Sequence, residues 1–378
     1  MRCAAVLLVL ARHANTRTFL ANVGWAGVDL FFVLSGFLIS GLLFTEYKTR
    51  GSIDFRRFFI RRGLKLYPAF YVLLAVTVIV RQALHQTNSL AGYLHEIFYV
   101  QNYFYGVWDH TWTLAVEEHF YILLPIFLLV LIRFSSDRAN PFRAIPLAFL
   151  LVAITCLALR IIRVRAIPAE QMPFLFGKVV DPTQNRMDSL FFGVLLGYIY
   201  HFKPHYLKVF QSRWIASALL ILASMLLSSC FFAPMTSRFM LTVGFTLVYL
   251  GFGILLIVCL QTHGMLPAAL LRPAEQIGSG FAYVGMYSYS IYLWHLAVNQ
   301  WFVGFVHRYL HVAMGPHRRD ALYLVVSILF GIAMSRLIEY PVLRLRDRMF
   351  PQFVSPIDAG TTPSKLSVGW LGNSSPSK

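Results

Sequence analysis

Two ionisable side chains near the beginning of the chain have the spacing of a shared helix face. His13 lies eleven residues after Arg2, in a stretch that is otherwise mostly apolar. In an α-helix this spacing is about three turns, so both side chains point the same way, about 16 Å apart along the axis. We place His13 in mid-membrane, where an imidazole is a candidate proton acceptor. A packing or interfacial histidine is the alternative.

Basic residues gather between positions 56 and 65. Arg57, Arg61 and Lys65 recur at every fourth position, and Arg62 lies three positions before Lys65. A helix brings such residues onto one face, where guanidinium groups can bind phosphate oxygens in bidentate fashion. The alternative is a cytoplasmic topology signal that also contacts anionic lipids.

Two adjacent carboxylates and a histidine lie in the apolar segment WTLAVEEHFYILLP, residues 112–125. A charged side chain at the centre of a bilayer costs about 2.5–3.5 kcal/mol on insertion scales. Glu117 and Glu118 are therefore candidate functional residues. Capping of a helix end at the membrane interface is the alternative, because the cost of a charge is smaller there.

Other polar residues interrupt apolar stretches, and each also has a structural interpretation. Asp29 could cap a helix, Arg186 and Asp188 could form an ion pair, and a lone histidine in a packed helix is more often structural than catalytic. With these alternatives open, we predict that six residues line a substrate pore: Asp29, Ser35, Trp112, Arg186, Asp188 and His295.

The elements that position these residues must be membrane helices. Of the 378 residues 58% are hydrophobic and only 13% are charged, and the mean hydropathy is +0.63. Soluble domains are about 25% charged. A soluble protein of this length could not bury so much apolar surface. The net charge of +17 would suggest nucleic acid in a soluble protein, whereas here it indicates basic cytoplasmic loops.

The fold that we expect is all-α, with about ten membrane spans around a polar pore. A span needs about 20 mostly apolar residues. We predict spans near residues 3–21, 25–45, 66–84, 118–133, 144–162, 187–202, 213–232, 239–260, 281–303 and 320–338. A secretory signal is the alternative for the first segment, but it lacks a clean small-residue cleavage site. We expect Gly193 and Gly197 to form a helix-packing face.

The distribution of basic residues predicts the orientation. An even number of spans leaves both termini on one side, and the segments on that side carry 21 of the 33 Lys and Arg residues. This bias places both termini in the cytoplasm. We expect residues 1–345 to form the membrane domain. Residues 346–378, rich in Pro, Ser, Gly and Thr towards the end, should form a disordered cytoplasmic tail.

In their order along the chain, these motifs resemble the acyltransferase-3 family of membrane O-acyltransferases. The resemblance covers residues 2 to about 345. It rests on Arg2-x10-His13, GVDLFFVLSGFLI from residue 27, the basic run before Pro68, WTLAVEE from residue 112, RMD from residue 186 and SYSIYLWH from residue 288. The first two motifs are the most specific.

The resemblance implies an acyl-CoA donor, usually acetyl-CoA, that enters from the cytoplasm, and no metal. The acceptor is commonly a hydroxyl of a surface or exported glycan or glycolipid, in the inner membrane of a bacterium. By this resemblance His13 would be the catalytic histidine. We ourselves expect Glu117 or Glu118 to orient His13 or to hold sugar hydroxyls. The cofactor-binding residues that the resemblance implies are Arg2, Arg62 and Lys65, and the face of the basic run adds Arg61 as a further candidate.

Two positions depart from the family pattern. Lys65 stands where a second arginine is usual, which keeps the charge but loses the bidentate fork. Thr113 replaces a serine and retains the hydroxyl.

We expect membrane lipids and the glycan as partners, and no nucleic acid. A transporter or flippase for a lipid-linked glycan is the alternative function. Internal repeats would favour it, and the sequence shows none.

Overall fold

The structure is a computed structural model that describes residues 1–14, 16, 18–87, 89–261, 268–309 and 315–351. All the regular elements of the described chain are helical, without strands. Its α-helices are α1 (Arg2–Arg12), α2 (Phe19–Val23), α3 (Ala26–Arg50), α4 (Phe55–Ala83), α5 (Leu90–Ile97), α6 (Trp112–Phe134), α7 (Ile145–Ala166), α8 (Met172–Leu175), α9 (Gly177–Val180), α10 (Met187–Phe202), α11 (Pro204–Lys208), α12 (Arg213–Phe232), α13 (Phe245–Gln261), α14 (Ala268–Met286), α15 (Ser288–Ala297), α16 (Gly304–Tyr309), α17 (Pro316–Met334) and α18 (Tyr340–Met349).

Short 3-10 turns or π-helical segments join or interrupt these helices. The 3-10 turns are η1 (Asp109–Thr111), η2 (Ala169–Gln171), η3 (Thr183–Asn185) and η4 (Val209–Gln211). The π-helical segments are η5 (Met240–Gly244), η6 (Val298–Val303) and η7 (Ser335–Glu339).

Seven helical elements of the described chain are long and apolar enough to cross a membrane. They contain α3, α4, α6, α7, α12, α13 and the α17–α18 pair. The predicted all-α membrane fold is confirmed, but the count of about ten spans is not. Of the other expected spans, the first is divided between the 11-residue α1 and the start of α2, the sixth is the 16-residue α10, and the ninth is interrupted at Tyr287.

The first predicted span, residues 3–21, is wrong as a single helix. α1 ends at Arg12, and His13 is its C-cap. The sequence turns polar from His13 to Thr18, which ends the apolar stretch, and Thr18 then caps α2 by accepting a hydrogen bond from Ala21 N at 3.2 Å. His13 therefore lies at the junction of a helix and a loop, and not in the middle of a helix.

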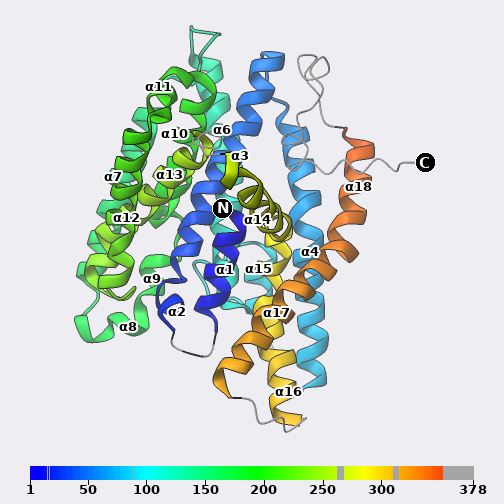
Figure 1. Cartoon of the computed structure of the whole chain (residues 1–378). Helices are drawn as coiled ribbons and strands as arrows, with labels where there is room; N and C mark the ends of the chain where they lie inside the picture. The colour runs from blue at the N-terminus through cyan, green and yellow to red at the C-terminus, as the bar shows by residue number, and fades with distance from the viewer. Residues whose placement is uncertain (15, 17, 88, 262–267, 310–314, 352–378) are drawn as a thin grey trace.

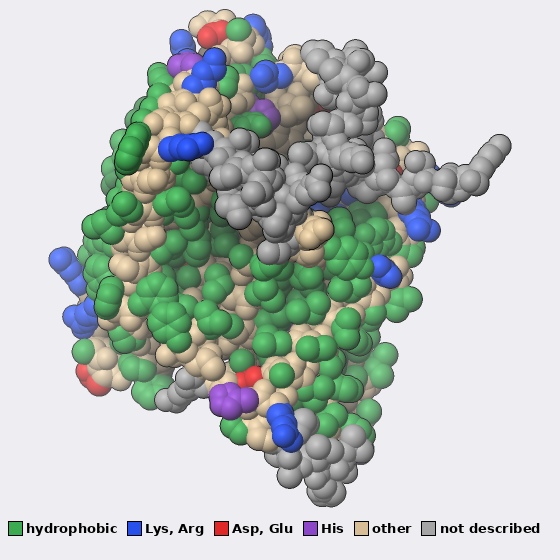
Figure 2. All heavy atoms as spheres, viewed as in Figure 1, with side chains coloured by type: hydrophobic (Ala, Val, Ile, Leu, Met, Phe, Trp, Pro, Cys, Tyr) green, Lys and Arg blue, Asp and Glu red, His purple; other side chains and the backbone are tan. Residues whose placement is uncertain are grey.

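Figure 1 shows how α1 sits in the bundle. The N-terminus lies near the middle of the view, and α1 runs from there towards the end that carries α2, α8, α9 and α16, which we name the lower end. The opposite, upper end carries α11. Between the two ends the visible face is largely hydrophobic, as expected of a surface that faces lipid (Figure 2).

Close packing between α3 and α10 holds the centre of the bundle. A Cβ atom added to Gly36 would lie 1.9 Å from the Leu190 carbonyl oxygen, and one added to Gly193 would lie 2.3 Å from that of Val33. Only glycine allows the two backbones to approach so closely. The predicted packing face of Gly193 and Gly197 is thereby confirmed, since a Cβ on Gly197 would meet Ser40 Oγ at 2.5 Å.

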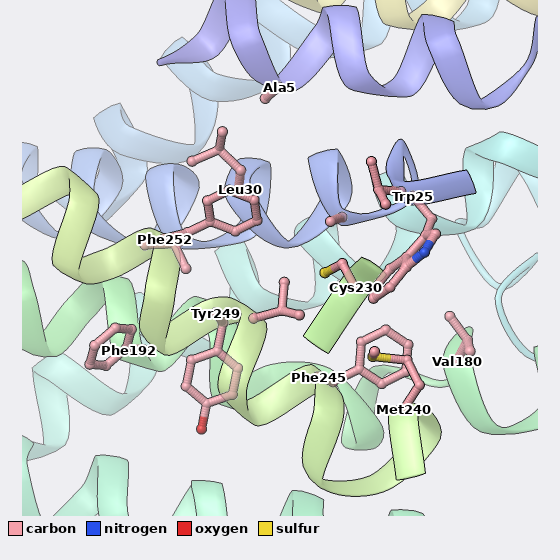
Figure 3. Close-up of a cluster of buried hydrophobic side chains, with 14 of the residues drawn as sticks. Ala5, Trp25, Leu30, Val180, Phe192, Cys230, Met240, Phe245, Tyr249 and Phe252 are labelled. Carbon is pink, nitrogen blue, oxygen red and sulfur yellow. The ribbon is translucent and has the colours of Figure 1, made fainter. Parts of the chain in front are cut away.

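A large apolar core fixes α1 and the start of α3 against α13. Figure 3 shows Ala5, Leu30 and Phe252 within this cluster, which continues to Trp25 at the beginning of α3. The Trp25 ring meets the edge of the Phe245 ring at 5.4 Å between centroids. The contacts of this core hold α1 in place, and with it His13, which directly follows α1.

The predicted boundary between domain and tail at residue 345 falls inside a helix. α18 continues through Met349, and it begins directly after η7. The remainder of the predicted tail, residues 352–378, lies outside the described residues.

Candidate active site

A pocket lies among α1, α3, α4, α6 and α15, with three cationic side chains in its wall. Arg2, Arg62 and Lys65 line it together with Glu117, and it is a narrow pocket with a cavity volume of about 70 Å³. Its other lining residues are Val28, Phe31, Phe32, Leu34, Ser35, Leu66, Thr113, Leu114, Ser288, Tyr289 and Tyr292. Cations inside a mostly apolar wall suit an anionic ligand with an apolar portion.

The basic residues of α4 divide between the pocket and the surface of α18. Arg62 and Lys65 line the pocket, and the Arg62 guanidinium lies 3.8 Å from the centroid of the Tyr121 ring. Arg61, in contrast, bonds to the Asp347 carboxylate at 3.0 Å and to the Phe350 carbonyl oxygen. The Asp347 carboxylate thus holds Arg61 at α18. Arg61 was a predicted cofactor-binding residue, but it does not line this pocket.

The two adjacent glutamates of α6 point to different partners. Ser35 Oγ donates to Glu117 Oε1 at 2.5 Å and lies 2.9 Å from the Tyr121 hydroxyl. The Tyr67 hydroxyl donates to Glu118. Neighbouring positions on a helix face different directions, which explains the split. None of these hydrogen bonds reaches His13, so they do not support the expected orienting role.

His13 is held by backbone and side-chain contacts at the end of α1. Its Nδ1 atom lies 3.0 Å from the Val9 carbonyl oxygen and 3.3 Å from Nε2 of His295. Asn299 Nδ2 donates to the His13 carbonyl oxygen at 2.9 Å. The structure therefore brings together His13 and His295, which the sequence separates by most of the chain.

A third histidine, His110, completes this cluster and was missed in the sequence. Its ring lies 4.8 Å from the ring of His295, and its Nε2 atom lies 3.1 Å from the Leu293 carbonyl oxygen. The position of His110 two residues before Trp112 was the available signal. In the described part of the chain, no group of three or more His, Cys, Asp or Glu side chains is arranged to hold a metal ion.

A buried carboxyl group organises the loop that carries His110. Glu96 Oε1 accepts hydrogen bonds from Val107 N and Trp108 N, each at 3.0 Å, and from Thr111 Oγ1 at 2.8 Å. Burial raises the pKa of Glu96 to about 7, although these hydrogen bonds oppose the shift. Glu96 was also missed in the sequence, because its partners lie on a loop without a regular pattern.

Tyr292 belongs both to the pocket and to the histidine cluster. It lines the pocket, while its hydroxyl donates to the His110 carbonyl oxygen at 2.7 Å and lies 2.6 Å from Thr113 Oγ1. Its ring lies 5.6 Å from the ring of His295 between centroids. His13 is not among the lining residues, so the Tyr292 side chain connects the pocket with the histidines.

Four of the predicted pore-lining residues make structural contacts with buried partners. Arg186 pairs with Asp29 at 2.7 Å, and Asp188 pairs with Arg160 at 2.8 Å, all with side chains at most 2% exposed. Trp112 packs edge-on against Phe32, with 6.1 Å between ring centroids. None of these residues except Phe32 lines the pocket. Ser35, in contrast, lies in its wall, and His295 lies in the histidine cluster.

Known proteins resemble this chain over most of its length. A family model described as "Acyltransferase domain" matches residues 1–336. The chain is 30% identical over 94% of its length to "Putative O-acetyltransferase SAR0937" of Staphylococcus aureus strain MRSA252, and 28% identical over 90% to "Peptidoglycan O-acetyltransferase OatA" of Listeria monocytogenes. It spans only 59% and 54% of those two proteins. No solved structure matches the chain significantly.

Proposed function

The chain belongs to this acyltransferase family, and from that premise we propose that it transfers an acetyl group from acetyl-CoA to a hydroxyl of a cell-envelope glycan. One observation carries the proposal: a pocket with three cations in its wall is joined through Tyr292 to a cluster of histidines. The pocket suits a phosphorylated donor with an apolar arm, and the cluster provides a proton acceptor.

The dimensions of α1 support a donor that extends along it. Arg2 lines the pocket and His13 directly follows the helix, so about 16 Å of helical rise separates them. This distance is close to the reach of an extended coenzyme from a phosphate to its thioester. With its phosphates near Arg62 and Lys65, the donor would pass Tyr292 to bring the acetyl group to His13.

The proposed reaction uses His13 as the general base. Nε2 of His13 takes the proton of the acceptor hydroxyl while the hydroxyl oxygen forms a bond to the acetyl carbonyl carbon. The carbon–sulfur bond then breaks, and the sulfur leaves as a thiolate that receives a proton from the imidazolium. General-base catalysis of this kind contributes about 10²–10⁴-fold to a rate.

The proposed acceptor is an envelope glycan, and the proposed location is the inner membrane of a bacterium. A relative is named a peptidoglycan O-acetyltransferase, which supports a wall or envelope glycan as the acceptor here. The relatives are bacterial proteins, which supports a bacterial inner membrane as the location. The basic run at residues 56–65 supports the cytoplasm for the side that carries it, and we propose that both termini lie on that side. Acetyl-CoA would then enter from the cytoplasm and the glycan from the opposite side.

A direct assay tests the proposed function. The purified full chain in lipid nanodiscs, given isotope-labelled acetyl-CoA and a panel of peptidoglycan fragments and other envelope glycans, should acetylate at least one of them. Mass spectrometry of the glycan should show the labelled ester, which mild base removes. Movement of a lipid-linked glycan across vesicles without any acetylation would identify a transporter and contradict the proposal.

The donor site makes a second prediction. Replacing Arg62 or Lys65 with Ala should raise the KM for acetyl-CoA at least about tenfold, because a lost hydrogen bond to a charged phosphate weakens binding by about 1.5–3 kcal/mol. Arg56→Ala is the matched control, since Arg56 lies on the same helix and is exposed. Unchanged KM values in both variants, with normal protein abundance, would assign these charges to lipid contact or topology.

A further inference from the structure

The tautomer of His295 follows from its hydrogen bond to the backbone. Nδ1 of His295 lies 2.5 Å from the Tyr292 carbonyl oxygen. A carbonyl oxygen can only accept a hydrogen bond, so Nδ1 of His295 must carry the hydrogen. In the neutral ring Nε2 is then unprotonated, and it can only accept. The atom that His295 presents to His13 is therefore an acceptor.

The same reasoning assigns the tautomer of His13. Nδ1 of His13 lies 3.0 Å from the Val9 carbonyl oxygen and 3.3 Å from Nε2 of His295. Both neighbours are acceptors, so the hydrogen of His13 must be on Nδ1. The other tautomer would set the Nδ1 lone pair against two further lone pairs. The contacts thus leave Nε2 of His13 unprotonated and able to take a proton.

The surroundings of His295 favour a neutral ring with its hydrogen on Nδ1. Its side chain is fully buried, and its backbone lies one turn before the π-helical segment η6, which supplies Asn299 to the His13 carbonyl oxygen. His110 is the other imidazole that contacts His295, with 4.8 Å between ring centroids. Because Nε2 of His110 lies 3.1 Å from the Leu293 carbonyl oxygen, it carries the hydrogen of that ring. In the neutral His110 ring no ring N–H is left to compete for Nε2 of His295.

We infer that His295 is a positioning residue that fixes the Nδ1–H tautomer of His13, so that Nε2 of His13 faces the acceptor hydroxyl as a base. This inference rests on the proposed function. His295 holds the place that a carboxylate takes in a Ser-His-Asp triad, where the third residue orients the base and stabilises its protonated form. A neutral imidazole does the same here without introducing a charge into the apolar interior.

Three substitutions of His295 distinguish the hydrogen-bond acceptor at Nε2 from the space that the ring fills. His295→Gln can place a carbonyl oxygen near the former position of Nε2 and still accept from His13. The side chain of His295→Asn is shorter, so it can keep a donor near the Tyr292 carbonyl oxygen but cannot reach His13. His295→Leu removes both interactions. His201→Leu is the matched control, because His201 is a partly buried histidine at the upper end of α10.

We expect kcat to fall in each variant that lacks a hydrogen-bond acceptor for Nδ1–H of His13. In steady-state assays with acetyl-CoA and an accepted glycan, the Asn and Leu variants should lower kcat by about 100-fold or more. Their KM for acetyl-CoA should stay within about twofold of wild type. The Gln variant should retain kcat to within about tenfold, and His201→Leu should behave like wild type. Thermal unfolding in the same nanodiscs confirms that each variant is folded.

Two results would overturn the inference. If the folded Asn and Leu variants keep a wild-type kcat while His13→Ala is inactive, His295 has no positioning role although the proposed function stands. If Gln is as inactive as Asn while remaining folded, the imidazole itself is required, and acceptance from His13 is not its role. Full activity of both His13→Ala and His295→Leu would instead remove the proposed base.

Discussion

Replacing His13 with alanine is expected to abolish acetyl transfer while the protein remains folded and still binds acetyl-CoA. The residue follows the last turn of α1, so its loss leaves the apolar packing of that helix unchanged. Arg2, Arg62 and Lys65 line the pocket independently of His13. The missing contribution is the removal of the acceptor proton, which is worth about 10²–10⁴-fold. The loss should therefore appear in kcat, measured by release of free CoA.

His13→Gln distinguishes catalysis from packing. Glutamine retains polarity and hydrogen bonding but cannot act as a base near neutral pH. A catalytic His13 predicts that Gln is nearly as inactive as Ala, whereas a packing role predicts that Gln restores much of the activity. His205→Ala is the control, since His205 lies exposed on α11 at the upper end. A Gln variant with a nearly wild-type rate would remove His13 as the base and favour Glu117, which lines the pocket.

Replacing Arg160 with glutamine is expected to destabilise the protein by about 3–5 kcal/mol, because it leaves the buried Asp188 carboxylate without its partner. Arg160 also donates to the Asn185 carbonyl oxygen at 3.0 Å and to Thr246 Oγ1 at 2.8 Å. The substitution therefore removes several contacts in a region where water cannot replace them. Denaturant unfolding in detergent micelles measures the loss.

Arg50→Gln is the matched control for this prediction. Arg50 faces Glu46 at 3.5 Å with 37% of its side chain exposed, so its pair should contribute at most about 1 kcal/mol. Changing both partners of the buried pair, as Arg160→Met with Asp188→Leu, should recover most of the stability. A loss for Arg160→Gln no larger than that for Arg50→Gln would contradict the structural role. Reduced transfer in a fully stable variant would return Asp188 to the substrate site, as its sequence motif predicted.

The sequence alone determined the class of the protein and several of its functional candidates. Its high hydropathy and its long apolar runs predicted helices in a membrane, because a spanning helix needs about 20 mostly apolar residues. The order of short motifs predicted the acyltransferase family, and the match over residues 1–336 confirms it. A polar or charged side chain is costly inside a membrane, so such a residue in an apolar stretch is a candidate for function. For this reason His13, Arg62 and Lys65 could be selected from the sequence alone.

The tertiary structure decided what those polar residues contact. Asp29, Arg186 and Asp188 look the same in sequence as Ser35 and His295, yet the first three form buried ion pairs, in which Arg160 is the unforeseen partner. Arg61 and Arg62 are neighbours, but only Arg62 lines the pocket, because Asp347 on α18 binds Arg61. His110 lies in the histidine cluster because hydrogen bonds to Glu96 hold the loop that carries it. Helical periodicity gives the direction of a side chain on its own helix, whereas its partner depends on how distant helices pack.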